Sequence, residues 1–160
     1  MSTINDLTKQ APRSPRQRIG GYVILARCLD KGRATLNSAN GDYHFNCPLD
    51  NFLFNFKDVK GEDVLQLLTD GATDEQVVEW LNNNGAKRSK HDIEAWSDQT
   101  EAYRPYDFPD KREWFVEECA KVGLDPSISS LFDMLEADDE QSYQGKERDV
   151  AVALAEAGTA

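Results

Sequence analysis

The sequence predicts an all-α fold, a single domain built as an irregular bundle of six to seven helices. Apolar residues recur at helical spacing in several segments that lie between helix start and stop signals. No segment shows the sustained two-residue alternation, rich in β-branched residues, that would predict strands. The chain has 160 residues, of which 39% are hydrophobic, which is enough for one packed core.

The first predicted helix covers residues 17–38 and is expected to lie at the centre of the bundle. Residues 1–15 are polar and contain two prolines, so we expect a flexible basic arm before it. Asn40-Gly41 is a strong stop signal that ends the helix. Its apolar pattern consists of Tyr22, Leu25, Ala26, Leu29 and Leu36.

Two short helices are predicted next, after a connector over residues 42–48 that could be extended. Pro48 favours a helix start, and residues 49–56 follow it with three phenylalanines and two leucines. Lys60-Gly61 then breaks the chain before a second short helix over 62–69.

Capping signals predict the following two helices. Thr73 and Gln76 match a capping box at the start of the segment 73–85, which we expect to form a helical hairpin with the segment before it. Ser89, with Asp92 three residues later, begins the next helix.

The last two helices are predicted on either side of a proline-containing turn. An aromatic loop over 103–109 leads into an amphipathic helix over 110–122, which ends at Gly123. A final short helix is expected over 130–137, so that the helical domain covers 16–140 and is followed by a polar, then Ala-rich tail over 141–160.

Charge and cysteine content restrict the class of partner. The net charge is −11, yet residues 1–34 carry seven Lys or Arg against two Asp. An acidic body disfavours nucleic-acid binding, because that requires a broad basic surface. No apolar run is long enough for a membrane span and no secretory signal is visible, while the three dispersed cysteines are typical of reduced thiols. We therefore expect a cytoplasmic protein with neither a nucleic-acid nor a membrane partner.

The basic N-terminal segment is the first candidate site. Glycines at a helix start expose backbone N–H groups to anions, and flanking arginines add carboxylate or phosphate recognition. The alternative is that these arginines pair with acidic helices of their own chain while Gly20-Gly21 allows close packing. The candidate ligand-binding residues are Arg16, Arg18, Gly20, Gly21, Arg27, Lys31 and Tyr43.

The second candidate is the connector, which carries the weak catalytic candidates His44 and Cys47, with Asp30 as a third. Cys–His chemistry needs contact in space, which a three-residue separation only permits. The spacing of His44, Cys47 and Asp50 lacks the paired geometry of zinc sites, so no metal is expected. No fingerprint of a cofactor is found either, and none is expected. The alternative is that Cys47 is a small buried apolar residue and that His44 bonds the backbone.

Several phrases of the sequence resemble an uncharacterised bacterial family that is known as a domain of unknown function, serial number five thousand and sixty-nine. The resemblance covers residues 11–140 and implies one intact domain, but no activity, cofactor or partner. The phrases that carry it are RSPRQRIGGY, LARCLDKGRATL, GDYHFNCPLDNFLF, GATDEQVVEWL and EAYRPYDFPDKREWFVEECAKVGLDP.

We therefore expect a binding or interaction module that recognises an anionic small ligand or an acidic partner through its basic N-terminal segment. The alternative is a small enzyme for an anionic substrate, which Arg16, Arg18 and Arg27 would bind and on which His44 would act as acid or base. A purely structural role is the third hypothesis. If Arg27 or Lys31 lines the same cavity as His44 or Cys47, the enzyme or small-ligand hypothesis is favoured. If these side chains point to separate faces, it is disfavoured.

Overall fold

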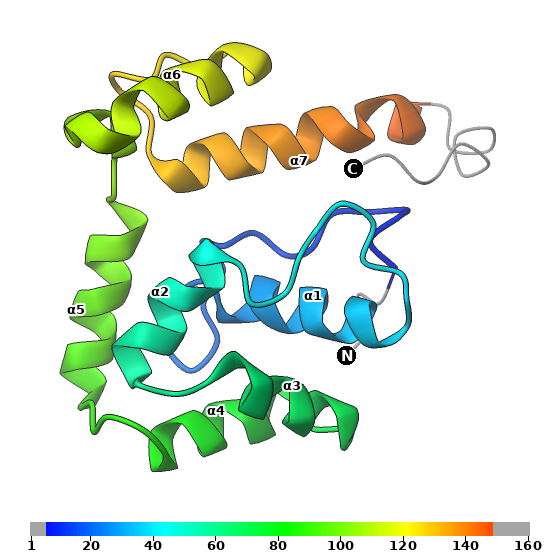
Figure 1. The fold of residues 1–160 in the computed structure, drawn as a ribbon, viewed down its shortest axis with the longest axis vertical. Helices are drawn as coiled ribbons and strands as arrows, with labels where there is room; N and C mark the ends of the chain where they lie inside the picture. The colour runs from blue at the N-terminus through cyan, green and yellow to red at the C-terminus, as the bar shows by residue number, and fades with distance from the viewer. Residues whose placement is uncertain (1–5, 149–160) are drawn as a thin grey trace.

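A computed structural model describes residues 6–148 of the chain. Within them the fold is all-α, as predicted, with seven α-helices and one short 3-10 helix (Figure 1). In chain order these are α1 (Leu25–Leu36), α2 (Pro48–Lys57), α3 (Gly61–Thr69), α4 (Asp74–Asn83), α5 (Lys90–Glu101), η1 (Pro105–Asp107), α6 (Pro109–Val122) and α7 (Leu131–Arg148).

The helices surround two apolar clusters. The larger one is centred on α1 and receives side chains from α2, α3, α4, α5 and α7. The smaller one lies between α6 and α7 and contains Phe115, Cys119, Leu131 and Met134. In Figure 1 α6 and α7 form the upper layer, α1 to α4 form the lower one, and α5 runs between the two layers. Leu49 and Leu135 pack against both clusters, so the two layers share one core.

The capping signals at α4 and α5 are confirmed. The Thr73 hydroxyl accepts a hydrogen bond from the Gln76 N–H, and the Gln76 side chain accepts one from the Thr73 N–H. Ser89 and Asp92 make the same reciprocal pair at α5. Each box satisfies two N–H groups that a helix start otherwise leaves without a partner.

The prediction of a long first helix over 17–38 is wrong at its start, because α1 begins only at Leu25. Gly20, Gly21 and Ile24 all have positive φ, at 60°, 87° and 74°, which no α-helix accommodates. Residues 19–22 instead form a tight turn in which Ile19 and Tyr22 exchange backbone hydrogen bonds. A Cβ on Gly20 would lie 2.4 Å from Cγ1 of Val78, so the turn packs closely against α4.

The predictions of a flexible arm over 1–15 and a tail over 141–160 are also corrected for the residues that the structure describes. Leu7 in the arm and Tyr143 in the tail are both buried against the domain. Leu7 is fully buried, and its backbone N–H bonds the carbonyl of Ala39. Helix α7 continues to Arg148, eleven residues beyond its predicted end, and Tyr143 on it is buried and donates a hydrogen bond to the carbonyl of Leu7. Each segment therefore covers the other. The Ala-rich end of the predicted tail lies outside the described residues.

Within residues 6–148, none of the helices combines the length and the apolar character that a transmembrane span requires.

Candidate functional site

The basic N-terminal segment, residues 13–33, makes ion pairs with acidic side chains of the same chain. Arg13 binds the buried Asp30 through both Nε and Nη2, and its Nη1 lies 2.9 Å from Asp74. Arg33 approaches the other oxygen of Asp74 at 2.8 Å. Asp30 is thus held as a structural anchor for Arg13 rather than presented to a ligand. Asp74, at the start of α4, joins two arginines that are twenty residues apart.

The environment of Asp74 changes its pKa. Burial raises the pKa of this carboxyl group, but hydrogen bonds from Arg13 and Arg33 lower it more, so that the net shift is downward. Asp74 is therefore an ionised carboxylate in the neutral range, and its two arginines attach the basic segment to α4.

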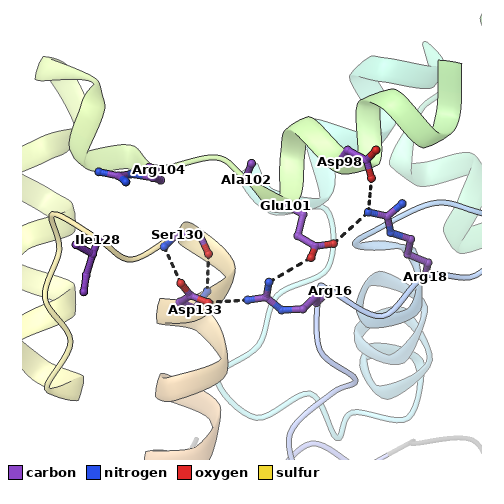
Figure 2. Close-up of a pocket in the computed structure, with 9 residues that line it drawn as sticks. All are labelled: Arg16, Arg18, Asp98, Glu101, Ala102, Arg104, Ile128, Ser130 and Asp133. Atoms are coloured by element: carbon purple, nitrogen blue, oxygen red, sulfur yellow. Dashed lines mark hydrogen bonds and ion pairs between the residues drawn. The ribbon is translucent and has the colours of Figure 1, made fainter. Parts of the chain in front are cut away.

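Arg16 and Arg18 line a common pocket, whose volume is about 380 Å³. Figure 2 shows Glu101 between the two guanidinium groups, with an ion pair to each of them. Arg16 also contacts Asp133 and Glu136 at the start of α7, at 2.7 and 3.2 Å. The basic segment thus bridges the end of α5 and the beginning of α7. The lining residues are Arg16, Arg18, Asp98, Glu101, Ala102, Arg104, Ile128, Ser130 and Asp133.

Arg16 and Arg18 differ in how many of their guanidinium nitrogens donate hydrogen bonds. All three nitrogens of the Arg16 guanidinium donate hydrogen bonds to carboxylates. Arg18 donates only through Nη2, to Asp98 at 2.8 Å and to Glu101 at 3.1 Å. Among the described residues, no hydrogen-bond partner is found for its Nε and Nη1. The Asp98 side chain is 70% exposed, whereas that of Arg18 is 32% exposed.

Arg104 borders the same pocket from the loop after α5. Figure 2 shows its guanidinium on the far side of Ala102 from Arg16, toward the loop that carries Ile128. There it donates a hydrogen bond to the Ser127 carbonyl and forms an ion pair with Asp107. Its contribution is therefore to the edge of the pocket.

Gly20 and Gly21 do not line the pocket, and the N–H groups that follow them are engaged. The Val23 N–H donates to the hydroxyl of Ser97, which itself donates to the carbonyl of Gly21, and the Ile24 N–H donates to the carbonyl of Pro15. The expected cradle of free amides at a helix start is thus not formed. The two glycines instead allow the close packing that was the alternative.

Arg27 is buried and belongs to a separate cluster beneath α7. Its guanidinium binds both oxygens of Asp139, at 2.7 and 3.1 Å, and lies over the ring of Tyr43. The Tyr43 hydroxyl donates to the same carboxylate at 2.9 Å. Burial lowers the pKa of Arg27, but Asp139 raises it more, so that the guanidinium stays charged. Arg27 and Tyr43 therefore hold α7 in place.

Lys31 belongs to a third cluster, formed by α1 and the start of α2. Its Nζ lies 3.0 Å from Oδ1 of Asp50 and 3.1 Å from Sγ of Cys47. Burial lowers the pKa of Lys31, but Asp50 and the sulfur atoms of Cys47 and Cys28 raise it more, so that Lys31 is an ammonium. Asp50 is completely buried, while Cys47 keeps partial exposure. The alternative in which Cys47 is a small buried apolar residue is thus wrong, because Cys47 is only partly buried.

His44 is exposed and lines a different pocket, with a volume of about 300 Å³. Neither Arg27 nor Lys31 lines this pocket or the one at Arg16. Neither of these two pockets therefore combines Arg27 or Lys31 with His44 or Cys47, although Lys31 contacts Cys47 outside them. Among the described residues, no three His, Cys, Asp or Glu side chains are grouped so that they could hold a metal ion.

The sequence did not reveal the roles of three residues that organise these clusters. Arg13 belongs to the basic candidate segment but was not among the predicted ligand-binding residues. Asp50 was considered with His44 and Cys47 as a metal ligand or acid–base group, and not as the partner of Lys31. Asp139 lies in the acidic run that was placed at the end of the domain, so no sequence signal paired it with Arg27.

Residues 9–141 match the model of a protein family whose description is Domain of unknown function (DUF5069). The match covers most of the chain, including the basic segment, the connector and the larger part of α7. The curated proteins contain no match to the chain.

Proposed function

The chain belongs to the DUF5069 family, and we propose that it is a binding module which takes an anionic small ligand at Arg18. The ligand would carry a carboxylate or a phosphate and would enter the pocket between the basic segment, α5 and α7. The observation that carries the proposal is the incomplete use of the Arg18 guanidinium, whose Nε and Nη1 have no hydrogen-bond partner among the described residues.

Arg18 is suited to exchange its present partner for a ligand. An ion pair between exposed side chains contributes only about 0–1 kcal/mol, so the pair with Asp98 is weak. A carboxylate or phosphate that meets two guanidinium N–H groups side by side forms a stronger, bidentate contact. Asp98, with most of its side chain in solvent, would then turn away. In this proposal Asp98 occupies the place of the ligand when the ligand is absent.

Arg16 has a different role in the proposed site. Its three carboxylate partners leave none of its nitrogens free for a ligand. It fixes Glu101 and the start of α7 around the pocket, and thereby supplies a rigid wall. Because Glu101 and Asp133 also line the cavity, a ligand with several negative charges would be repelled. The proposal therefore favours ligands that carry one anionic group and a neutral body.

The test is calorimetric titration of the protein with small monocarboxylates and with a phosphate monoester, at matched ionic strength. Saturable binding is expected for at least one of these probes. Asp98→Asn should tighten that binding, because it removes the internal competitor, and Arg18→Gln should abolish it. Lys87→Gln is the matched control, since Lys87 is exposed and distant in sequence, and it should leave binding unchanged.

Two outcomes would contradict the proposal. If no probe binds the wild type or the Asp98→Asn variant, the arginine is a structural partner of α5 only. If binding is equally weakened by Arg18→Gln and Lys87→Gln, the effect is general screening rather than a site. An acidic protein partner in place of a small ligand would be indicated if only acidic peptides, and none of the small probes, bind in an Arg18-dependent way.

The compartment belongs to the same proposal. Cys28, Cys47 and Cys119 are free thiols, which is the usual state in a reducing environment. These thiols favour a cytoplasmic protein. The proposal that it is bacterial rests on the family resemblance of its sequence.

A further inference from the structure

Helix α1 and the beginning of α2 bring four reactive or charged side chains together. Cys28 and Lys31 are three residues apart on one face of α1, and Cys47 and Asp50 are three residues apart at the start of α2. Residues at this spacing share a helix face. The two pairs meet so that the Lys31 ammonium lies 3.1 Å from the Cys47 sulfur and 3.0 Å from the Asp50 carboxylate.

Solvent access distinguishes the members of this cluster. Lys31 is 3% exposed, and Cys28 and Asp50 are completely buried. Cys47 is partly exposed and lies between the exposed residues Asn46 and Pro48. Cys47 is therefore the member of the cluster that is most accessible to a small oxidant from solvent.

Two positive groups of the fold adjoin the Cys47 side chain. Lys31 donates a hydrogen bond to the sulfur, and Cys47 is also the N-cap residue of α2, where the helix dipole favours an anion. The thiolate is the form of cysteine that attacks a peroxide. Partial exposure beside a buried cation is thus the environment in which thiols become reactive.

We propose that Cys47 is a peroxide-reactive thiol, and that Lys31 captures its oxidised form in a reversible covalent bond between Nζ and Sγ. This bond would connect α1 to the start of α2. It is independent of the proposed ligand site, which lies at Arg18.

The chemistry balances in two steps. The Cys47 sulfur first attacks a peroxide, the O–O bond breaks, and the products are a sulfenic acid, S–OH, and water when the oxidant is hydrogen peroxide. The Lys31 ammonium then passes one proton to Oδ1 of Asp50, which leaves a lone pair on Nζ. This nitrogen attacks the sulfur, and an N–S bond forms while the S–O bond breaks. The second proton of the nitrogen departs with the hydroxyl group as water. Sulfur is oxidised by two electrons and the peroxide is reduced by two.

Asp50 allows the N–S bond to form in a buried site, because it can take up the proton that Lys31 loses. Its Oδ1 is 3.0 Å from Nζ and forms no hydrogen bond of regular geometry among the described residues, so it is placed to accept a proton. After the reaction both Lys31 and Asp50 are neutral. No charge is left buried without a partner, which would be costly.

Cys28 is the competing partner for an oxidised Cys47, by way of a disulfide. Complete burial and the neighbouring Asp50 raise the pKa of the Cys28 thiol well above its ordinary value. Its thiol therefore stays protonated at neutral pH, whereas Lys31 can pass a proton directly to Asp50, 3.0 Å away. Lys31 already touches the sulfur and is the expected partner.

The test is peptide mapping of the folded protein after treatment with hydrogen peroxide, compared with untreated protein. Trypsin should no longer cleave after Lys31, and the peptide 28–33 should be joined to the peptide 34–57, with the loss of two hydrogen atoms. A thiol reductant should restore both peptides and the cleavage. Cys47→Ser should abolish the product, whereas Cys28→Ser and the distant control Cys119→Ser should retain it.

Three results would overturn the proposal. The first is a disulfide, in which cleavage after Lys31 is retained and the product is lost in Cys28→Ser. The second is irreversible oxidation of Cys47 to the sulfinic acid with Lys31 unmodified. The third is a Cys47 that remains reduced under conditions that oxidise a short cysteine peptide. The tested variants change sulfur to oxygen only, and their circular dichroism at equal concentration verifies that they are folded.

Discussion

The Arg27 guanidinium binds both carboxylate oxygens of Asp139, at 2.7 and 3.1 Å, across 112 residues of chain. Both side chains are almost completely buried. Because the same carboxylate accepts a hydrogen bond from Tyr43, it connects α7 to α1 and to the connector at once. Removing one charge from such a pair leaves the other buried without a partner.

Asp139→Ala is therefore expected to lower the free energy of unfolding by about 3–5 kcal/mol. The double variant Arg27→Met/Asp139→Leu should recover most of that loss, because apolar side chains of similar size can replace a buried pair. Urea denaturation with a shared m-value gives the comparison. A loss below about 1 kcal/mol in the single variant, the range of a surface ion pair, would mean that the carboxylate is not buried in solution.

Tyr143 provides a separate measure of how α7 is held. Tyr143→Ala should cost about 3–5 kcal/mol, because it leaves a cavity beside Leu7. Tyr143→Phe keeps the ring and removes the hydroxyl that bonds the Leu7 carbonyl, so about 1 kcal/mol is expected. Thermal or urea unfolding of both variants tests the order. If the two were equal and near zero, residues 141–143 would be a tail rather than part of the domain.

Gly20→Ala is expected to destabilise the protein more than Gly71→Ala. Both glycines have positive φ, at 60° and 85°. Each substitution therefore places a side chain in the left-handed region, which costs about 1–2 kcal/mol. A Cβ on Gly20 would in addition lie 2.4 Å from Val78, whereas a Cβ on Gly71 has no atom within 4 Å. Equal losses of stability would show that the turn at Gly20 can move away from α4.

Stability should fall in acid as Asp74 is protonated. Its pKa is lower in the folded protein than the ordinary value of 3.8, so the ionised group stabilises the fold above about pH 4. That contribution is lost progressively as the pH falls through 3.8 toward the folded pKa. In Asp74→Asn the stability at neutral pH should be lower and its decline between pH 5 and 3 shallower. An unchanged slope would mean that other carboxylates govern acid unfolding.

Local signals in the sequence predicted the fold well where neighbours along the chain decide it. The reciprocal caps at Thr73 and Ser89 fixed the starts of α4 and α5, and Gly123 adopts the left-handed conformation that ends α6. These features depend on residues within one turn of one another. Their interpretation needed no knowledge of the rest of the chain.

Tertiary contacts decide the features that were predicted wrongly. The turn over 19–22 interrupts an apolar pattern of helical spacing, because Ser97 on a distant helix binds its backbone. The segment 138–143 of α7 is polar in sequence, and the buried side chains of Asp139 and Tyr143 are held by Arg27 and by the Leu7 carbonyl. The candidate site was predicted in part, since Arg16 and Arg18 do share a pocket, but the carboxylates that occupy them could not be assigned from the sequence.

The ion pairs between the basic segment and α7 also impose an order on synthesis. Arg16 and Arg27 leave the ribosome more than a hundred residues before their partners Asp133, Glu136 and Asp139. Since translation proceeds from the N-terminus, the emerging chain presents Arg27 without its carboxylate partner, and Arg16 with only Glu101, until the last helix is made. Closure of the domain by α7 then covers apolar surface and withdraws these cations in a single step. A ribosome stalled before residue 131 would hold a nascent chain in which the Arg27 guanidinium lacks its carboxylate partner.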